Sequence, residues 1–145
     1  MLVKAAALHV ASLGHARYGE LGPTSARRGF VVDMPSTPDE AVCVYPNPSF
    51  PPDDDLSGYD NPELQIVVRT AKDAGHEAGY DAAEAIRRDL RDTASVVWAA
   101  GTEHEQHIFS CDANESAPVN LGPDENGRPR WSVSFQVKTL PEVSP

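Results

Sequence analysis

The sequence predicts an α+β domain, a mainly antiparallel sheet with helices packed on one side. Residues 63–70 and 131–138 alternate apolar and polar side chains, the period-two pattern of strands with one buried face. Between them, residues 76–91 repeat apolar side chains at helical spacing. Strands that return through short connections pair antiparallel, which gives the sheet its predicted type.

Length and composition favour one folded unit. The chain has 145 residues, of which 40% are hydrophobic and 23% charged, close to ordinary globular values. A domain of this length buries roughly two thirds of its unfolded surface. We therefore expect a single domain spanning residues 1–145 with one core.

The charge balance bears on the class of partner. Twelve basic residues against 22 acidic ones give a formal charge of −10, which argues against a nucleic-acid grip. No apolar run approaches the roughly 20 residues needed to cross a membrane, so no membrane association is expected. The N-terminal run resembles a signal peptide only weakly, and we interpret it as a helix with Leu2, Ala6, Val10 and Leu13 on one face.

Residues 29–62 predict two short strands followed by a long loop. Residues 29–33 and 41–45 are strand candidates separated by a turn at 34–40, which suggests a hairpin or a nearby pair. Residues 46–62 then hold five prolines and four aspartates, which excludes a helix or a central strand. Loops of this length in compact domains are usually functional or disordered. We expect an extended loop there.

The C-terminal third predicts three strands. Residues 95–100 and 106–112 form two strands joined by a turn at Gly101. Residues 121–130 are dense in turn formers, including the pair Asn126 and Gly127. The clearest strand, 131–138, follows with one core face and one wet face.

No set of residues meets the requirements of a catalytic or metal site. His104 and His107 are three apart in a turn that enters a strand, whereas the helical zinc motif needs four. On a strand, His107, Phe109 and Cys111 would share one face. The aspartates at 53–55 and at 60 lack the spacing of a calcium loop and are expected to be solvated.

Nucleophile and phosphate motifs are also missing from the sequence. It contains no serine elbow and no phosphate-binding glycine loop, and Asp124 and Glu125 lie where acids serve turn hydrogen bonds. Cys43 and Cys111 are too sparse for a disulfide framework and are expected to stay reduced. We predict no catalytic residue, no cofactor and no metal.

Two arginines allow two interpretations. Arg69 ends its strand and Arg128 lies beside the tight turn. Arginine is enriched at protein interfaces, where it anchors charged pairs. A local salt bridge within the chain is the equal alternative.

Several segments in this order resemble the tail terminator, or minor capsid, proteins of long-tailed double-stranded DNA bacteriophages. The similarity covers most of the chain. It departs at residues 49–56, where such proteins often carry a glycine-rich turn and this chain has prolines and aspartates. The matching segments are the N-terminal helix, MPSTPD at 34–39, AVCVY at 41–45, DNPELQIVVR at 60–69, the helix core Ala82, Ala83, Ile86 and Leu90, LGPDENGRP at 121–129 and WSVSFQV at 131–137.

The resemblance implies a structural virion protein rather than an enzyme. Such a protein forms a ring, expected to be hexameric, on the head-proximal end of the tail tube, where it ends tube polymerisation and docks the head connector. Its partners would be its own copies, the tail tube protein and the head-tail connector. Genomic DNA would pass through the lumen without specific binding. The protein would lie at the head-tail junction of the virion, and in the host cytoplasm during assembly.

Within this interpretation, the loop at 46–62 is the expected docking element, and charged residues near the tight turn add to the interface. The interface candidates are Pro51, Pro52, Asp53, Asp54, Asp55, Tyr59, Arg69, Asp124, Arg128 and Arg130.

Two alternatives remain open from the sequence. One is a head completion or connector-stopper ring of similar size and symmetry. The other, from a different class, is a small metal-dependent hydrolase that uses His104 and His107 with Cys111 or Asp112. A small-molecule binding module has no positive feature in this sequence.

Overall fold

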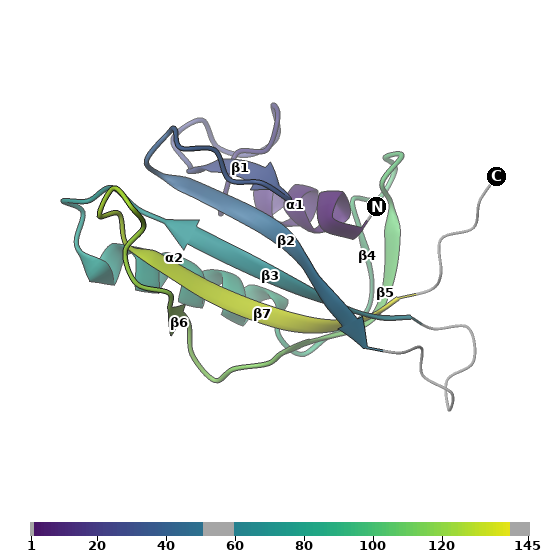
Figure 1. The fold of residues 1–145 in the computed structure, drawn as a ribbon. Helices are drawn as coiled ribbons and strands as arrows, with labels where there is room; N and C mark the ends of the chain where they lie inside the picture. Colours follow the sequence, from purple (N-terminus) through teal and green to yellow (C-terminus); the bar gives the residue numbers. More distant parts are fainter. Residues whose placement is uncertain (1, 51–59, 140–145) are drawn as a thin grey trace.

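The fold is described from a computed structural model, which places residues 2–50 and 60–139. Seven strands form a mostly antiparallel, curled sheet, and two helices pack against it (Figure 1). The predicted α+β class is confirmed. The elements in chain order are α1 Leu2–Ser12, β1 Arg28–Val31, β2 Ala41–Phe50, β3 Asn61–Arg69, α2 His76–Leu90, β4 Thr93–Trp98, β5 Gln106–Ala113, β6 Val119–Asn120 and β7 Arg130–Thr139.

The sheet is ordered around β3 and β7. Its strand order is β1-β2-β3-β7-β5-β4, with β6 paired to β7. All pairs are antiparallel except β1 with β2, which is parallel. The two clearest sequence strands are therefore neighbours in the middle of the sheet, where both of their edges are paired.

One face of the sheet is apolar and carries both helices. Ile66 lies opposite Val133 and Leu64 opposite Phe135, and all four side chains are buried. They form one core cluster with residues of α1 and α2. Figure 1 shows both helices behind the sheet, so the opposite face carries no helix among the described residues.

Helix α1 is buried on more than one side. Ala5, Ala6, Ala7 and Ala11 are all buried, and the helix contacts β1, β2 and β4. Alanine lets the backbone approach these strands closely, so the curled sheet wraps the helix. The buried surface of α1 is therefore wider than the single apolar face expected from the sequence. Leu13, expected on that face, lies beyond the end of the helix and is 42% exposed.

Helix α2 is amphipathic as predicted and approaches β7 at a glycine. Ala83, Ile86 and Leu90 are buried. A Cβ atom added at Gly79 would lie 2.7 Å from Trp131 Cδ1, closer than such atoms pack. The absence of a side chain at Gly79 therefore sets how closely α2 sits on Trp131.

Of the two arrangements expected for the first two strands, the nearby pair is confirmed and the hairpin is wrong, because β1 and β2 are hydrogen-bonded neighbours that run parallel. Val32 leaves β1 with φ of 68°, and the connection returns along the strand before β2 starts at Ala41. Carbonyl groups of Pro38 and Asp39 in this connection accept hydrogen bonds from Arg69. The short connection can cross back because this long-range contact holds it.

Strands also extend into the segment predicted as loop. β2 continues to Phe50, and β3 starts at Asn61. The β1–β2 pairing ends at Val31 with Val44, so β2 is an edge strand beyond that pair, and an edge tolerates the proline at position 46. The sequence also gave no sign of the two-residue strand β6.

A bulge changes the expected face of β5. Its pairing with β7 shifts between Ile108 and Ser110, so Phe109 is exposed while Cys111 is buried. A bulge adds a residue to one strand and reverses the alternation after it. His107 and Phe109 are both exposed, so the predicted shared face is wrong for Cys111, which follows the bulge and is buried.

The structure shows the state of both cysteines and the length of both helices. Cys43 and Cys111 are free and buried. In the part of the chain that the structure describes, neither helix is long and apolar enough to cross a membrane.

Gly79→Ala is expected to lower the free energy of unfolding by about 1–3 kcal/mol, because the new methyl group overlaps Trp131. This is opposite in sign to the helix-propensity gain of a glycine-to-alanine change. Urea unfolding measures it. In a Trp131→Leu background the penalty should shrink, and an equal penalty in both backgrounds would place the cause elsewhere.

The Glu84 cluster on α2 predicts acid sensitivity. Glu84 Oε1 lies 2.7 Å from Arg87 Nη2 and 3.0 Å from Arg88 Nε. Hydrogen bonds from Arg87, reinforced by Arg88, lower the pKa of Glu84 from 4.5 to about 2. Its contribution to stability is therefore full above pH 4.5 and is lost as the pH falls toward 2. The stability difference between wild type and Glu84→Gln, followed by urea unfolding, should be large at pH 7 and small at pH 2.5. The control Glu77→Gln, at an exposed position of the same helix, should show no such trend.

Candidate interface on the helix-free face

The helix-free face of the sheet contains a hollow of about 370 Å³. It lies where β3 and β7 meet the β1–β2 connection and the turn that precedes β7 (Figure 1). Four of the sequence candidates, far apart along the chain, come together there. The lining residues are Met34, Ser36, Tyr45, Gln65, Val67, Arg69, Leu121, Asp124, Glu125, Arg128 and Arg130.

Arg69 is a buried cation whose partners are backbone carbonyls. Its side chain belongs to a residue only 4% exposed. Nε donates to the carbonyl of Asp39 at 3.1 Å, and Nη2 donates to that of Pro38 at 2.5 Å. Burial, followed by the nearby charge of Arg128, lowers the pKa of Arg69, but a guanidinium remains protonated. Arg69 therefore fixes the β1–β2 connection against the sheet.

Arg128 is equally buried and joins two segments, the β1–β2 connection and its own turn before β7. Its Nε donates to Asp124 Oδ2 at 2.8 Å, and its Nη1 donates to the Ser36 carbonyl at 2.5 Å and to Asp39 Oδ1 at 3.1 Å. Asp124 in turn accepts the backbone N–H groups of Asn126 and Arg128, both at 2.9 Å. Burial opposes ionisation of Asp124, but these hydrogen bonds outweigh it and lower its pKa. The turn and the connection are thus held together by one ion-pair network.

The rim of the hollow differs from its floor. Arg130 is half-buried and reaches the carbonyls of Gly122 and Leu121 only at 3.3 and 3.4 Å. Leu121 is 37% exposed, and Val119 on the neighbouring β6 is 41% exposed. Apolar side chains beside an accessible arginine are typical of protein interfaces. The rim, rather than Arg69 and Arg128, is what a partner could contact.

Two titratable groups of β2 lie in or beside the hollow, the hydroxyl of Tyr45 in its lining and the Cys43 thiol two residues before it. Burial raises the pKa of the Cys43 thiol to about 11. Burial and then the neighbouring Cys43 raise the pKa of Tyr45 to about 12. Both side chains therefore stay protonated, which suits a packed interface rather than acid-base or nucleophilic chemistry.

The histidine cluster does not assemble into a site. Cys111 is buried with its pKa raised to about 12, whereas His107 is exposed. Over residues 2–50 and 60–139, no three side chains of the types His, Cys, Asp and Glu gather closely enough to hold a metal ion. These residues stand apart because of the bulge in β5.

Other predicted interface residues fall outside this description. Pro51, Pro52, Asp53, Asp54, Asp55 and Tyr59 lie outside the described residues. Sequence reasoning did not single out Met34, Tyr45 or Leu121, which line the hollow. Leu121 could have been noticed as a large apolar residue in a turn-forming segment, but Met34 and Tyr45 carry no such signal.

Comparison with known proteins supplies the family. A family model described as bacteriophage tail terminator protein matches residues 9–141, which is nearly the whole chain. The chain belongs to the bacteriophage tail terminator family. A search of curated proteins found no match. Tail terminators are structural proteins of the phage tail that act with the tail tube, and they are not enzymes.

Arg69→Met should lower the free energy of unfolding by about 2–4 kcal/mol, because it leaves buried carbonyl groups without donors. Arg130→Met should cost less than about 1 kcal/mol, since its hydrogen bonds are long and partly exposed. Chemical unfolding of the purified variants measures both. An Arg69→Met variant of unchanged stability that fails to assemble would instead assign Arg69 to an interface between subunits.

Proposed function

We propose that this tail terminator forms a ring, expected to be hexameric, at the head-proximal end of the tail tube. There it ends tube polymerisation and docks the tail to the head connector. The observation that carries the proposal is the family match over residues 9–141. A fold with one face free of helices, rimmed by apolar side chains and an accessible arginine, supports it.

Ring closure requires head-to-tail contacts between two different surfaces of the same chain. The outermost strands β1 and β4 are poor templates for added strands, and the part of β2 beyond Val44, also an edge, carries Pro46 and Pro48, which lack an N–H. β1 is short and its first residue already bridges to Arg17, while β4 contains Ser95 with φ of 54°. Irregular edges of this kind resist strand addition. Subunits are therefore expected to meet mainly through side chains.

The helix-free face is suited to stacking on another protein layer. Leu121, Val119 and Arg130 stand at its rim, while the Arg69 and Arg128 network keeps the surrounding turns in place. Beside this face, β2 and β3 lead into residues 51–59, part of the expected docking loop at 46–62. We assign the face to the tube and the loop to the head connector.

The charge fits a passage for DNA. Each subunit carries a formal charge of −10, and a six-membered ring carries six times that amount. A negative lumen repels the phosphate backbone, so DNA would pass without specific binding. The proposal assigns the protein to the head-tail junction of the virion, and to the host cytoplasm during assembly.

The structural rival is a connector-stopper ring, which has similar symmetry and a different attachment. The family match favours the terminator. Recovery of the protein on purified tails, rather than on purified heads, separates the two.

The function is tested by adding the protein to polymerising tail tube protein and measuring tube lengths by electron microscopy. Wild type should stop elongation at one end. A variant lacking residues 53–56 should keep its unfolding transition and still stop elongation, but the capped tails should no longer join heads. A variant in which those four residues are replaced by Gly and Ser keeps the length of the loop but removes its aspartates. Comparing it with the deletion variant shows whether head joining depends on the length of the loop or on the aspartates.

Unlimited tube growth in the presence of wild type would contradict the terminator function. A deletion variant that does not fold would show that the loop is structural rather than a docking element.

A further inference from the structure

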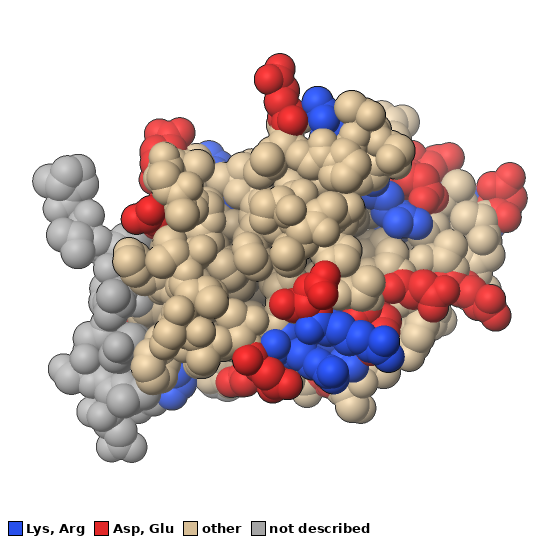
Figure 2. Space-filling view, turned by 180° about the vertical axis from the view of Figure 1, so that it is seen from behind, with Lys and Arg blue, Asp and Glu red and all other residues tan. Residues whose placement is uncertain are grey.

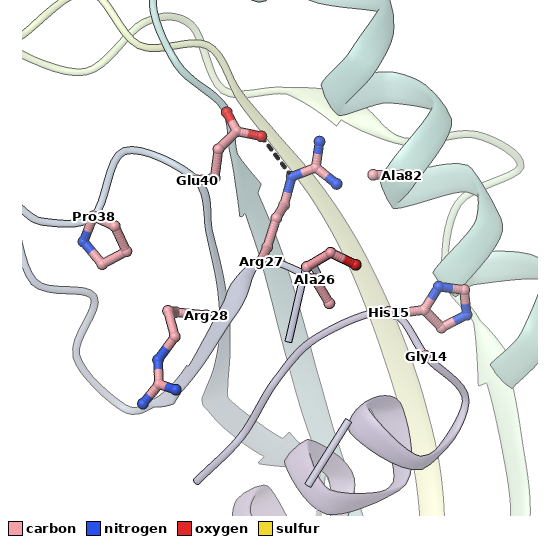
Figure 3. Close-up of a pocket in the computed structure, with 9 residues that line it drawn as sticks. Gly14, His15, Ala26, Arg27, Arg28, Pro38, Glu40 and Ala82 are labelled. Atoms are coloured by element: carbon pink, nitrogen blue, oxygen red, sulfur yellow. Dashed lines mark ion pairs between the residues drawn. The ribbon is translucent and has the colours of Figure 1, made fainter. Parts of the chain in front are cut away.

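A second hollow, of about 490 Å³, lies on the opposite side of the sheet from the first. We call it the arginine hollow, and Figure 3 shows it between the end of α1, the start of β1 and α2. Its lining residues are Gly14, His15, Ser25, Ala26, Arg27, Arg28, Pro38, Glu40 and Ala82.

The two arginines of this hollow are compensated to different degrees. Arg27 Nε lies 3.1 Å from Glu40 Oε1, close enough for an ion pair although not in hydrogen-bond geometry. Arg28 is exposed and reaches only the Gly19 carbonyl, at 3.5 Å. Among residues 2–50 and 60–139, it has no carboxylate partner. In Figure 3 the two side chains leave β1 in opposite directions, so Arg28 stands apart from Glu40.

The two arginines within α2 and the histidine of the hollow already have carboxylate partners. On the helix-bearing side of the molecule, basic and acidic side chains lie next to one another (Figure 2). In α2, Arg87 and Arg88 both contact Glu84. His15 at the edge of the hollow lies 2.5 Å from Asp89. Arg28 therefore stands at the edge of the hollow, with its side chain turned away from Arg27 and Glu40 and its charge left for a partner.

A matching acidic element lies elsewhere on the same chain. The turn between β4 and β5 carries Glu103 and Glu105. The Glu103 side chain is 87% exposed, and within the described part of the chain its one charged contact is Oε1 with His104 Nε2 at 3.4 Å. Glu105 accepts the N–H of Gly101 at 2.9 Å and has His107 at 3.8 Å, so it helps to fix the shape of the turn. Glu103 therefore projects from an ordered turn.

The placement of the two elements fits contact between copies. In Figure 1 the β4–β5 turn projects near the N-terminus of α1, and β1 begins toward the opposite end of that helix. Copies that each carry a charge of −10 repel one another, so a ring needs local contacts of opposite sign. A head-to-tail ring brings two different patches of the chain together at every interface.

We propose that the arginine hollow of one subunit receives the β4–β5 turn of a second copy, with Arg28 against Glu103. The inference rests on the proposed ring and names the contact that closes it. Each interface repeats the same pair, so a charge reversal at either position acts at every interface of the ring.

The test compares Arg28→Glu, Glu103→Arg and the double variant, with assembly followed by light scattering across protein concentration. Each single variant places like charges together and should need at least about tenfold more protein to assemble than wild type. The double variant restores the pair in reversed polarity and should assemble near the wild-type concentration. Arg91→Glu, the same charge change at an exposed position outside the hollow, should assemble like wild type.

An equal mixture of the two single variants adds a stricter test. In alternation, every hollow faces a turn of opposite charge, so the mixture should assemble if the ring has an even number of subunits. Unfolding transitions of all variants confirm that each is folded.

The proposal is overturned if folded single variants assemble like wild type, or if neither the double variant nor the mixture recovers assembly. In both cases a wild-type ring would leave the proposed function standing. A wild type that forms no ring, alone or on tails, would overturn the ring and this contact together.

Discussion

The helix-free side of this tail terminator depends on the burial of two neighbouring guanidinium groups. Arg69 and Arg128 are 4% and 5% exposed, and a buried charge is tolerated only when hydrogen bonds replace its water. The required acceptors come from the β1–β2 connection, at Ser36, Pro38 and Asp39, and from Asp124 in the turn before β7. These hydrogen bonds hold both segments against the sheet, and the first hollow lies between them. They also hold the connection in the path that makes β1 parallel to β2.

The parts of the fold that the sequence predicted are those governed by local pattern. The alternation in β3 and β7 and the helical spacing in α2 are properties of single segments, and all three elements form nearly where expected. The parallel β1–β2 pair and the extension of β2 to Phe50 depend on which strands are hydrogen-bonded neighbours. The spacing of apolar residues within one segment does not contain this information. In the same way, nothing in the sequence links Arg69 with Asp124, Arg128 and Arg130, which the structure brings together in one hollow. The carbonyl partners of the two buried arginines leave no mark in the sequence.

Different surfaces of the molecule are proposed to contact different partners. The helix-free face, with Leu121, Val119 and Arg130 at its rim, is the proposed contact with the tube. The arginine hollow and the β4–β5 turn are the proposed contacts between copies. Both sheet edges are short or irregular, so side-chain chemistry, rather than strand addition, would determine which surfaces meet. A strongly acidic chain that assembles with itself needs such local matches, because its overall charge opposes association.

The most direct test of the central claim is to determine the mass and symmetry of the purified protein, alone and bound to phage tails. Light scattering gives the mass, and negative-stain imaging gives the symmetry and the position on the tail. The account predicts a closed ring, expected to be six-fold, found at one end of the tails only. A protein that stays monomeric and never joins tails would contradict it.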